Sequence, residues 1–129
     1  MGTYKQLEAW KNSMKLTLVV YQQTNGFPKH EQYGLVSQIR RAAVSVPANI
    51  SEGAARLNSR EFQHFLRISF GSLAELESLL LLANKLGYLK KENHDVLRQM
   101  IILITAQLSG LMRVIQNKIS TNSNQDKPG

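Results

Sequence analysis

The chain has 129 residues and no cysteine. This excludes disulfide bonds, zinc sites built on thiolates and cysteine nucleophiles together. Aromatic residues make up only 7% of the chain, so we expect a mainly aliphatic core. The longest apolar run, Leu79–Ala83, falls far short of the roughly 20 residues that span a bilayer. No secretory signal pattern is present at the amino terminus, and we therefore expect a soluble cytoplasmic protein with no membrane contact.

Basic residues outnumber acidic ones, and the chain has a formal net charge of +7. The basic residues are spread along the chain and are not gathered in one arm. Spread basicity fits affinity for nucleic acid, and it fits ordinary colloidal solubility equally well. A chain of this length is one domain that buries enough surface to fold without a metal.

Apolar residues at three- and four-residue steps predict four helices and no strands. The helices are expected at about residues 7–24, 34–56, 59–86 and 91–119, in one domain over residues 1–119. Gly26 and Pro28 end the first helix, Asn58 caps the third and Gly87 ends it. The short connections favour an all-α, antiparallel, up-down-up-down four-helix bundle. The polar residues 120–129 are expected to form a disordered tail.

The apolar stripes of the first two helices are expected to face the core. On the first helix the stripe is Leu7, Trp10, Met14, Leu18 and Tyr21. On the second it is Leu35, Ile39, Ala42, Val46, Asn49 or Ile50, and Gly53. Pro47 removes one hydrogen bond and crowds the carbonyl of Ala43. Because the stripe continues in phase on both sides of Pro47, we expect a kink and not a break.

The third and fourth helices carry more apolar surface than three companion helices cover. Their expected core stripes are Phe62, Leu66, Ser69, Leu73, Leu76, Leu80 and Ala83, and Leu97, Ile101, Ile104, Leu108, Leu111 and Ile115. Outside these stripes lie Phe65, Ile68, Ser72, Leu79, Leu82 and Leu86, and Met100, Ile102, Leu103 and Met112. The extra apolar residues point to a further partner, and we expect the chain to associate with itself.

No pattern for catalysis or metal binding is complete. A di-metal bundle needs two Glu-x-x-His pairs, and this chain has one, Glu61 and His64. Acidic residues two apart on a helix point to different faces, and the three histidines are expected on loops or polar faces. We predict that the chain is not an enzyme and has no catalytic residue, metal, cofactor or small-molecule substrate.

Two polar stripes stand out on the second and third helices. They are Arg41, Ser45, Glu52 and Arg56 on one helix, and Arg60, His64, Arg67, Gly71, Glu75 and Ser78 on the other. One interpretation is a network of ion pairs that fixes the register of the two helices. The other is an arginine surface that contacts phosphates in a bidentate manner. Asn49, on an apolar stripe, is expected to specify packing, as buried asparagines do in coiled coils.

The runs YGLVSQIRRAAVSVPANISEG (33–53) and EFQHFLRISFGSLAELESLLLLANKLGYL (61–89), with Tyr4 to Trp10 before them, resemble a known family. It consists of four-helix bundle proteins named for open reading frames in intervening sequences of bacterial 23S rRNA genes. The resemblance covers about residues 4–115. It implies a closed homopentameric ring and no enzymatic activity. It also implies similarity to the basic accessory proteins of diversity-generating retroelements, which engage a reverse transcriptase and its RNA.

From these observations we expect a non-catalytic oligomeric bundle that binds structured RNA or other nucleic acid through basic residues presented by the ring. The alternative is a protein-protein interaction scaffold without nucleic-acid binding. The residues expected to contact nucleic acid are Arg41, Arg56, Arg60, Lys90 and Lys91. Those expected in a structural polar network are Arg40, Asn49, Glu52, Arg67 and Glu75, with Arg40 and Arg67 paired to Glu52 and Glu75.

Overall fold

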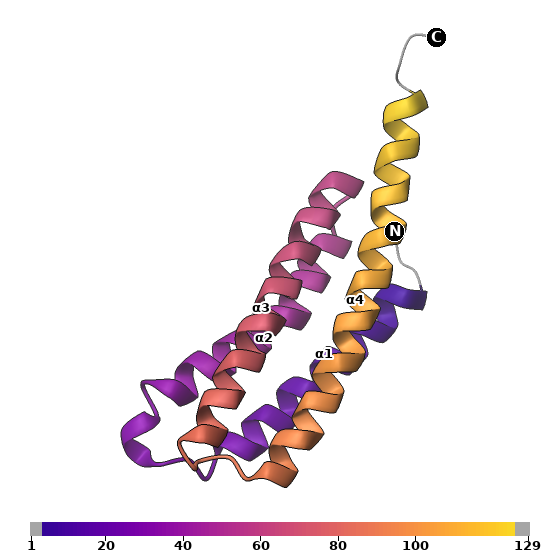
Figure 1. The fold of residues 1–129 in the computed structure, drawn as a ribbon. Coiled ribbons are helices and arrows are strands. Elements are labelled where there is room, and N and C mark those ends of the chain that lie inside the picture. Colours follow the sequence, from indigo (N-terminus) through magenta and orange to yellow (C-terminus); the bar gives the residue numbers. More distant parts are fainter. Residues whose placement is uncertain (1–3, 126–129) are drawn as a thin grey trace.

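The computed structural model describes the backbone of residues 4–125, and side-chain surroundings as far as residue 122. This part of the chain is all-α. Each helix contacts two others, in the cyclic order α1, α2, α3, α4 and back to α1, so α1 is diagonal to α3 and α2 to α4. Figure 1 shows the resulting up-down-up-down bundle. Its elements are α1 (Tyr4–Thr24), a short 3-10 turn η1 (Lys29–Glu31), α2 (Leu35–Ala54), α3 (Ser59–Lys85) and α4 (Lys91–Gln125).

The observed helix ends differ from the predicted ones mainly at the two termini. Helix α1 begins at Tyr4 and α4 continues to Gln125, so the last turns of α4 project beyond the other helices (Figure 1). The prediction of a disordered tail from residue 120 is therefore wrong for residues 120–125. Extending an existing helix fixes one residue for one added hydrogen bond, which allows a run of weak helix formers to stay helical. Residues 126–129 lie outside the described part.

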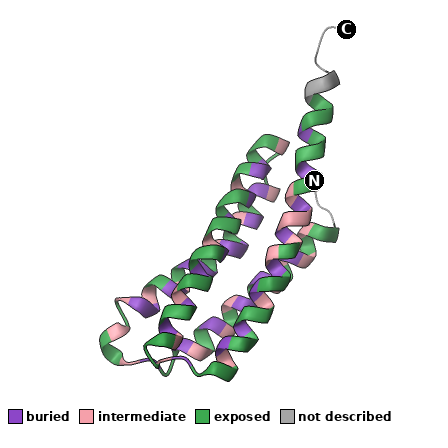
Figure 2. Ribbon diagram, in the orientation of Figure 1, coloured by how far each residue is buried: buried purple, intermediate pink, exposed green. Residues whose placement is uncertain are grey.

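The core stripes predicted for α2, α3 and α4 are confirmed. Every predicted core residue of α3 and α4 is buried, and Ile50, not Asn49, continues the stripe of α2. In Figure 2 buried segments recur along every helix, separated by exposed and intermediate ones. The main part of the core is aliphatic, with Phe62 as its largest fully buried side chain.

The core stripe predicted for α1 is wrong. The face of α1 toward the core carries Ala9, Ser13, Leu16, Val20 and Thr24. The predicted stripe instead faces outward, with Trp10 half-buried and the other four residues exposed by 41–63%. We call these four the α1 outer face: Leu7, Met14, Leu18 and Tyr21.

Small residues bring α2 and α3 together. A Cβ atom added at Gly53 would lie 2.8 Å from Cβ of Phe65 and 2.9 Å from Cδ1 of Phe62. The hydroxyl of Ser69 donates to the carbonyl of Val46 at 2.8 Å across the same interface. The absence of a side chain at Gly53 allows this close approach of α2 to α3.

Helix α2 is continuous through Pro47, as the sequence predicted. Because proline has no N–H, it leaves the carbonyl of Ala43 without its usual helical donor. Thr17 Oγ1 of α1 lies 3.2 Å from that carbonyl and 2.8 Å from the carbonyl of Ser13, and its hydroxyl hydrogen is shared between them. A side chain of α1 thus stabilises the position that Pro47 weakens in α2.

This arrangement predicts a thermodynamic coupling between Thr17 and Pro47. Thr17→Val should destabilise the protein by about 1–3 kcal/mol, because it leaves the fully buried Ala43 without a hydrogen-bond donor. In a Pro47→Ala background the restored N–H supplies the donor, and the same substitution should cost much less. Urea unfolding of the four proteins at one protein concentration measures the coupling free energy. Equal costs in the two backgrounds would contradict this role for Thr17.

Among the described helices, α4 is long and apolar enough, by length and composition alone, to cross a membrane over Lys91–Asn122. Core helices of bundles pass the same test. The apolar stripe of α4 from Leu97 to Ile115 is buried in this bundle. The fold accounts for that stripe, while Val96, Ile102 and Leu103 stay about half exposed on the outside.

Candidate nucleic-acid interface

Between pairs of described residues, no ion pair joins α2 to α3, so the predicted network is not found there. One ion pair between described residues joins Arg56 Nη2 to Glu52 Oε1 at 2.6 Å, within α2. The guanidinium of Arg56 also lies over the ring of Phe65, 5.1 Å from its centroid. Arg56, predicted to contact nucleic acid, is thus held by a carboxylate and an aromatic ring.

Arg40 is held by α1 and not by Glu52, so that predicted pairing is wrong. Its Nε donates to Thr24 Oγ1 at 3.0 Å and its Nη2 to the carbonyl of Tyr21 at 3.4 Å. The guanidinium carbon lies 4.5 Å from the centroid of the Tyr21 ring. These contacts fix the guanidinium at the point where the last turn of α1 meets α2.

Arg41 faces outward from α2 and its Nη2 donates to Ser37 Oγ at 3.2 Å. It lies between two hollows. The first, of about 690 Å³, runs along the outer side of α2 beside the end of α1, and we call it the α2 outer groove. Its lining contains no acidic residue: Tyr21, Gln32, Tyr33, Val36, Ser37, Arg40, Arg41, Val44, Ser45, Ala48 and Asn49.

The second hollow, of about 400 Å³, lies between α2 and α3, and its lining includes both Arg41 and Glu75. Ser45 Oγ and Ser72 Oγ share a hydrogen bond of 2.8 Å across it. Asn49 donates its amide to the carbonyl of Ser45 at 2.8 Å, a contact within α2. Glu75 makes no ion pair among the described residues, so the predicted pairing of Arg67 with Glu75 is also wrong. Arg67 is exposed on the outside of α3.

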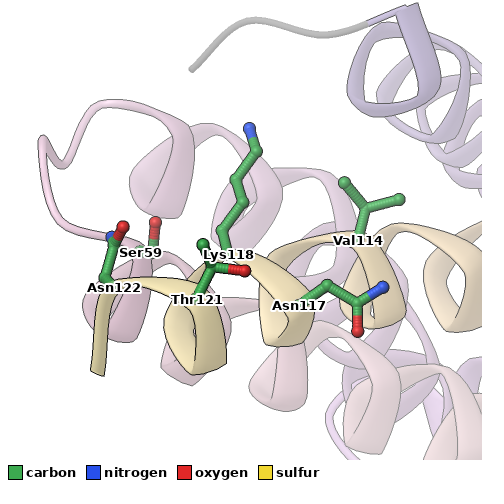
Figure 3. Close-up of a pocket in the computed structure, with 6 residues that line it drawn as sticks. All are labelled: Ser59, Val114, Asn117, Lys118, Thr121 and Asn122. Atoms are coloured by element: carbon green, nitrogen blue, oxygen red, sulfur yellow. The ribbon is translucent and has the colours of Figure 1, made fainter. Parts of the chain in front are cut away.

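The remaining predicted contact residues lie at opposite ends of the bundle. Arg60 lies in the first turn of α3. A hollow of about 420 Å³ lies between Ser59, the residue before Arg60, and the last turns of α4. Figure 3 shows its lining residues, among them Lys118 of α4. Lys90 and Lys91 lie at the other end, where Lys90 directly precedes α4 and Lys91 is its first residue. The five residues predicted to contact nucleic acid therefore do not form one surface.

The histidines are not gathered into a metal site in the described part of the chain. No three His, Asp or Glu side chains there could hold a metal ion. His64 is exposed with its ring against Phe65. His94, which we expected on a polar face, is buried in the first turn of α4.

One aromatic cluster joins the loop that follows α1 to the loop that follows α3. The ring of Tyr88 packs against Phe27 with a centroid separation of 5.7 Å, and its hydroxyl lies 3.5 Å from His30 Nε2. Partial burial, together with a hydrogen bond and the charge of Glu31, raises the pKa of Tyr88. This side chain is therefore neutral at physiological pH, and it packs the loops together.

Comparison with known proteins identifies a family. Residues 5–110 match the family of 23S rRNA-intervening sequence proteins. The fold is similar to that of a protein of unknown function from the S23 ribosomal protein family of Bacteroides thetaiotaomicron. The TM-score is 0.77 at 20% identity, over 84% of this chain and 98% of that chain, a likeness that shows the fold alone. No curated protein matches the chain, and neither similarity indicates an enzyme class. Since the family match extends over most of its length, the chain belongs to the 23S rRNA-intervening sequence proteins.

Proposed function

We propose that this protein is a non-catalytic bundle that associates with itself through Leu7, Met14 and Leu18 of the α1 outer face and binds RNA through exposed arginines such as Arg41 and Arg67. One observation carries the proposal. Helix α1 has apolar side chains on two opposite faces, but the bundle covers only one of them. A helix that is apolar on both sides is ordinarily buried on both sides.

A second copy of the chain is the occupant that best fits the α1 outer face. Other exposed apolar residues lie on α3, which is diagonal to α1, and on α4: Leu81, Leu82, Leu86, Ile102 and Leu103. Two separate apolar surfaces on one chain allow a head-to-tail contact, which closes into a ring when the rotation between neighbours permits. The expectation of five subunits comes from the family resemblance.

RNA binding is supported by the charges that remain unpaired. The chain has 16 basic and nine acidic residues, so basic groups outnumber acidic ones. Arg41 and Arg67 have no carboxylate partner, which favours phosphate contact over the structural network. Five copies of +7 would give a ring about +35, and multivalent display turns weak phosphate contacts into useful avidity.

Two measurements on the wild-type protein test this proposal. Light scattering at micromolar concentration should give about five times the chain mass of 14.6 kDa, in one species. Filter binding should show structured RNA retained at about 50 mM salt, with affinity falling steeply as salt rises. A monodisperse monomer would contradict the assembly. Assembly without RNA binding at low salt would replace the proposal with a scaffold that binds only proteins.

A further inference from the structure

The geometry points to the α2 outer groove as a site for single-stranded RNA, with Arg40 and Arg41 on the phosphates and Tyr33 stacking on a base. This inference rests on the RNA binding proposed above, and it names the place and the form of the RNA. Of the five residues predicted from the sequence to contact nucleic acid, only Arg41 lines this groove.

The two arginines are fixed in place and still have donors to offer. A guanidinium carries five N–H donors. The hydrogen bonds of Arg40 to Thr24 and Tyr21 use two, and that of Arg41 to Ser37 uses one. All of these acceptors are neutral, so neither positive charge is neutralised. With no acidic residue in the lining, the groove is suited to an anion that accepts hydrogen bonds from planar guanidinium groups.

Tyr33 gives the groove a surface for an aromatic ligand. Its side chain is 94% exposed, and it stands directly before α2, at one end of the groove. An exposed aromatic ring beside positive charge is the arrangement on which proteins stack the bases of single strands. Val44 and Ala48 line the groove farther along α2 and offer apolar contact to a sugar or base.

Size and accessibility favour a single strand over a duplex. About 690 Å³ falls within the roughly 300–1,000 Å³ typical of small-ligand sites, and this is enough for a nucleotide unit. In an A-form duplex the faces of the bases are covered by their neighbours, so Tyr33 could stack only on an unpaired base. The carboxylates of an acidic peptide could accept hydrogen bonds from the arginines, but such a peptide carries no base that would stack on the exposed Tyr33.

The experiment compares a fluorescent single-stranded oligoadenylate with a hairpin RNA of equal length and a minimal loop, by anisotropy at several salt concentrations. The wild-type protein should prefer the single strand. Tyr33→Ala should weaken binding of the single strand about tenfold, with the salt dependence unchanged, because one stacked base contributes roughly 1–3 kcal/mol. Tyr33→Phe should restore binding. Arg41→Ala should weaken binding and reduce the slope of log affinity against log salt by about 0.7.

Matched variants keep the test specific. Tyr4 is 78% exposed on α1, and Arg98 is exposed on α4, which is diagonal to α2. Tyr4→Ala and Arg98→Ala should bind the single strand nearly as the wild type does. Circular dichroism and light scattering should show that Tyr33→Ala keeps its helix content and its assembly state.

The outcomes separate this inference from the function on which it rests. If the wild type binds neither RNA, RNA binding and the groove site both fail. If the wild type binds but Tyr33→Ala and Arg41→Ala bind equally well, RNA binding stands and the groove is wrong. Loss of assembly in Tyr33→Ala would assign this residue to a subunit contact and overturn the site. A labelled polyglutamate that binds in place of RNA, and is lost in Arg41→Ala, would replace RNA by an acidic protein partner.

Discussion

Replacing Leu18 with Glu should convert the assembled protein into folded monomers. Leu18 is 63% exposed in the isolated chain, the most of any residue of the α1 outer face. A carboxylate there remains hydrated in the monomer and costs the fold little. In a subunit contact the same carboxylate would be buried without a partner, at a cost of several kcal/mol. Because 1.4 kcal/mol is a factor of ten in an equilibrium constant, micromolar assembly should be lost.

Light scattering and circular dichroism together measure this effect. The variant should scatter as a single chain of 14.6 kDa with unchanged helix content. Leu18→Met, which keeps an apolar side chain of similar volume, should remain assembled. If Leu18→Glu is still assembled at micromolar concentration, another surface joins the subunits.

The fold was predictable wherever each helix has one dominant apolar stripe. On α3 and α4 every residue of the predicted core stripe points inward, while Ile68, Leu82 and Ile102 beside these stripes stay exposed. Signals from neighbouring residues also predicted where α3 begins and ends. Asn58 Oδ1 accepts hydrogen bonds from the N–H groups of Arg60 and Glu61, and Gly87 adopts a φ of 81° after α3. These features depend on neighbouring residues alone.

Helix α1 could not be oriented in this way because it has two stripes. The prediction placed its larger apolar residues in the core, but the side that faces the core includes smaller residues such as Ala9 and Ser13. Ser13 satisfies its own hydroxyl by donating to the carbonyl of Trp10 at 2.9 Å, so it can lie in the core at little cost. When the larger apolar side chains of a helix face away from the core, side-chain size no longer shows which face is buried.

The candidate site was only partly predictable for a different reason. Helical spacing shows which residues share a face, but not how two packed helices are rotated against each other. Glu52 pairs with Arg56 at i,i+4 spacing, which helical spacing alone can show. Arg40 contacts Tyr21 and Thr24 of α1, which it cannot show. Tyr33 had no distinguishing signal in the sequence. Its exposure and its place in the same groove as Arg41 appear only in three dimensions.

Gly53→Ala should destabilise the bundle, although alanine is the better helix former. The added Cβ would lie 2.8 Å from Cβ of Phe65 and 3.2 Å from the carbonyl oxygen of Phe62. Neither atom is the end of a flexible side chain, so α2 and α3 must move apart. Overpacking of this kind costs about 1–3 kcal/mol, more than the roughly 0.5–1 kcal/mol gained by removing a glycine from a helix.

Gly71→Ala provides the opposite case within the same pair of helices. An added Cβ at Gly71 meets no atom within 4 Å, and this residue is exposed in the middle of α3. Here the helix-forming advantage of alanine acts alone, and the protein should gain roughly 0.5–1 kcal/mol. Urea unfolding at one fixed protein concentration compares the two variants, since the proposed assembly would make stability depend on concentration. If both substitutions stabilise the protein, α2 and α3 are not packed closely at Gly53, and the small residues of α2 need another explanation.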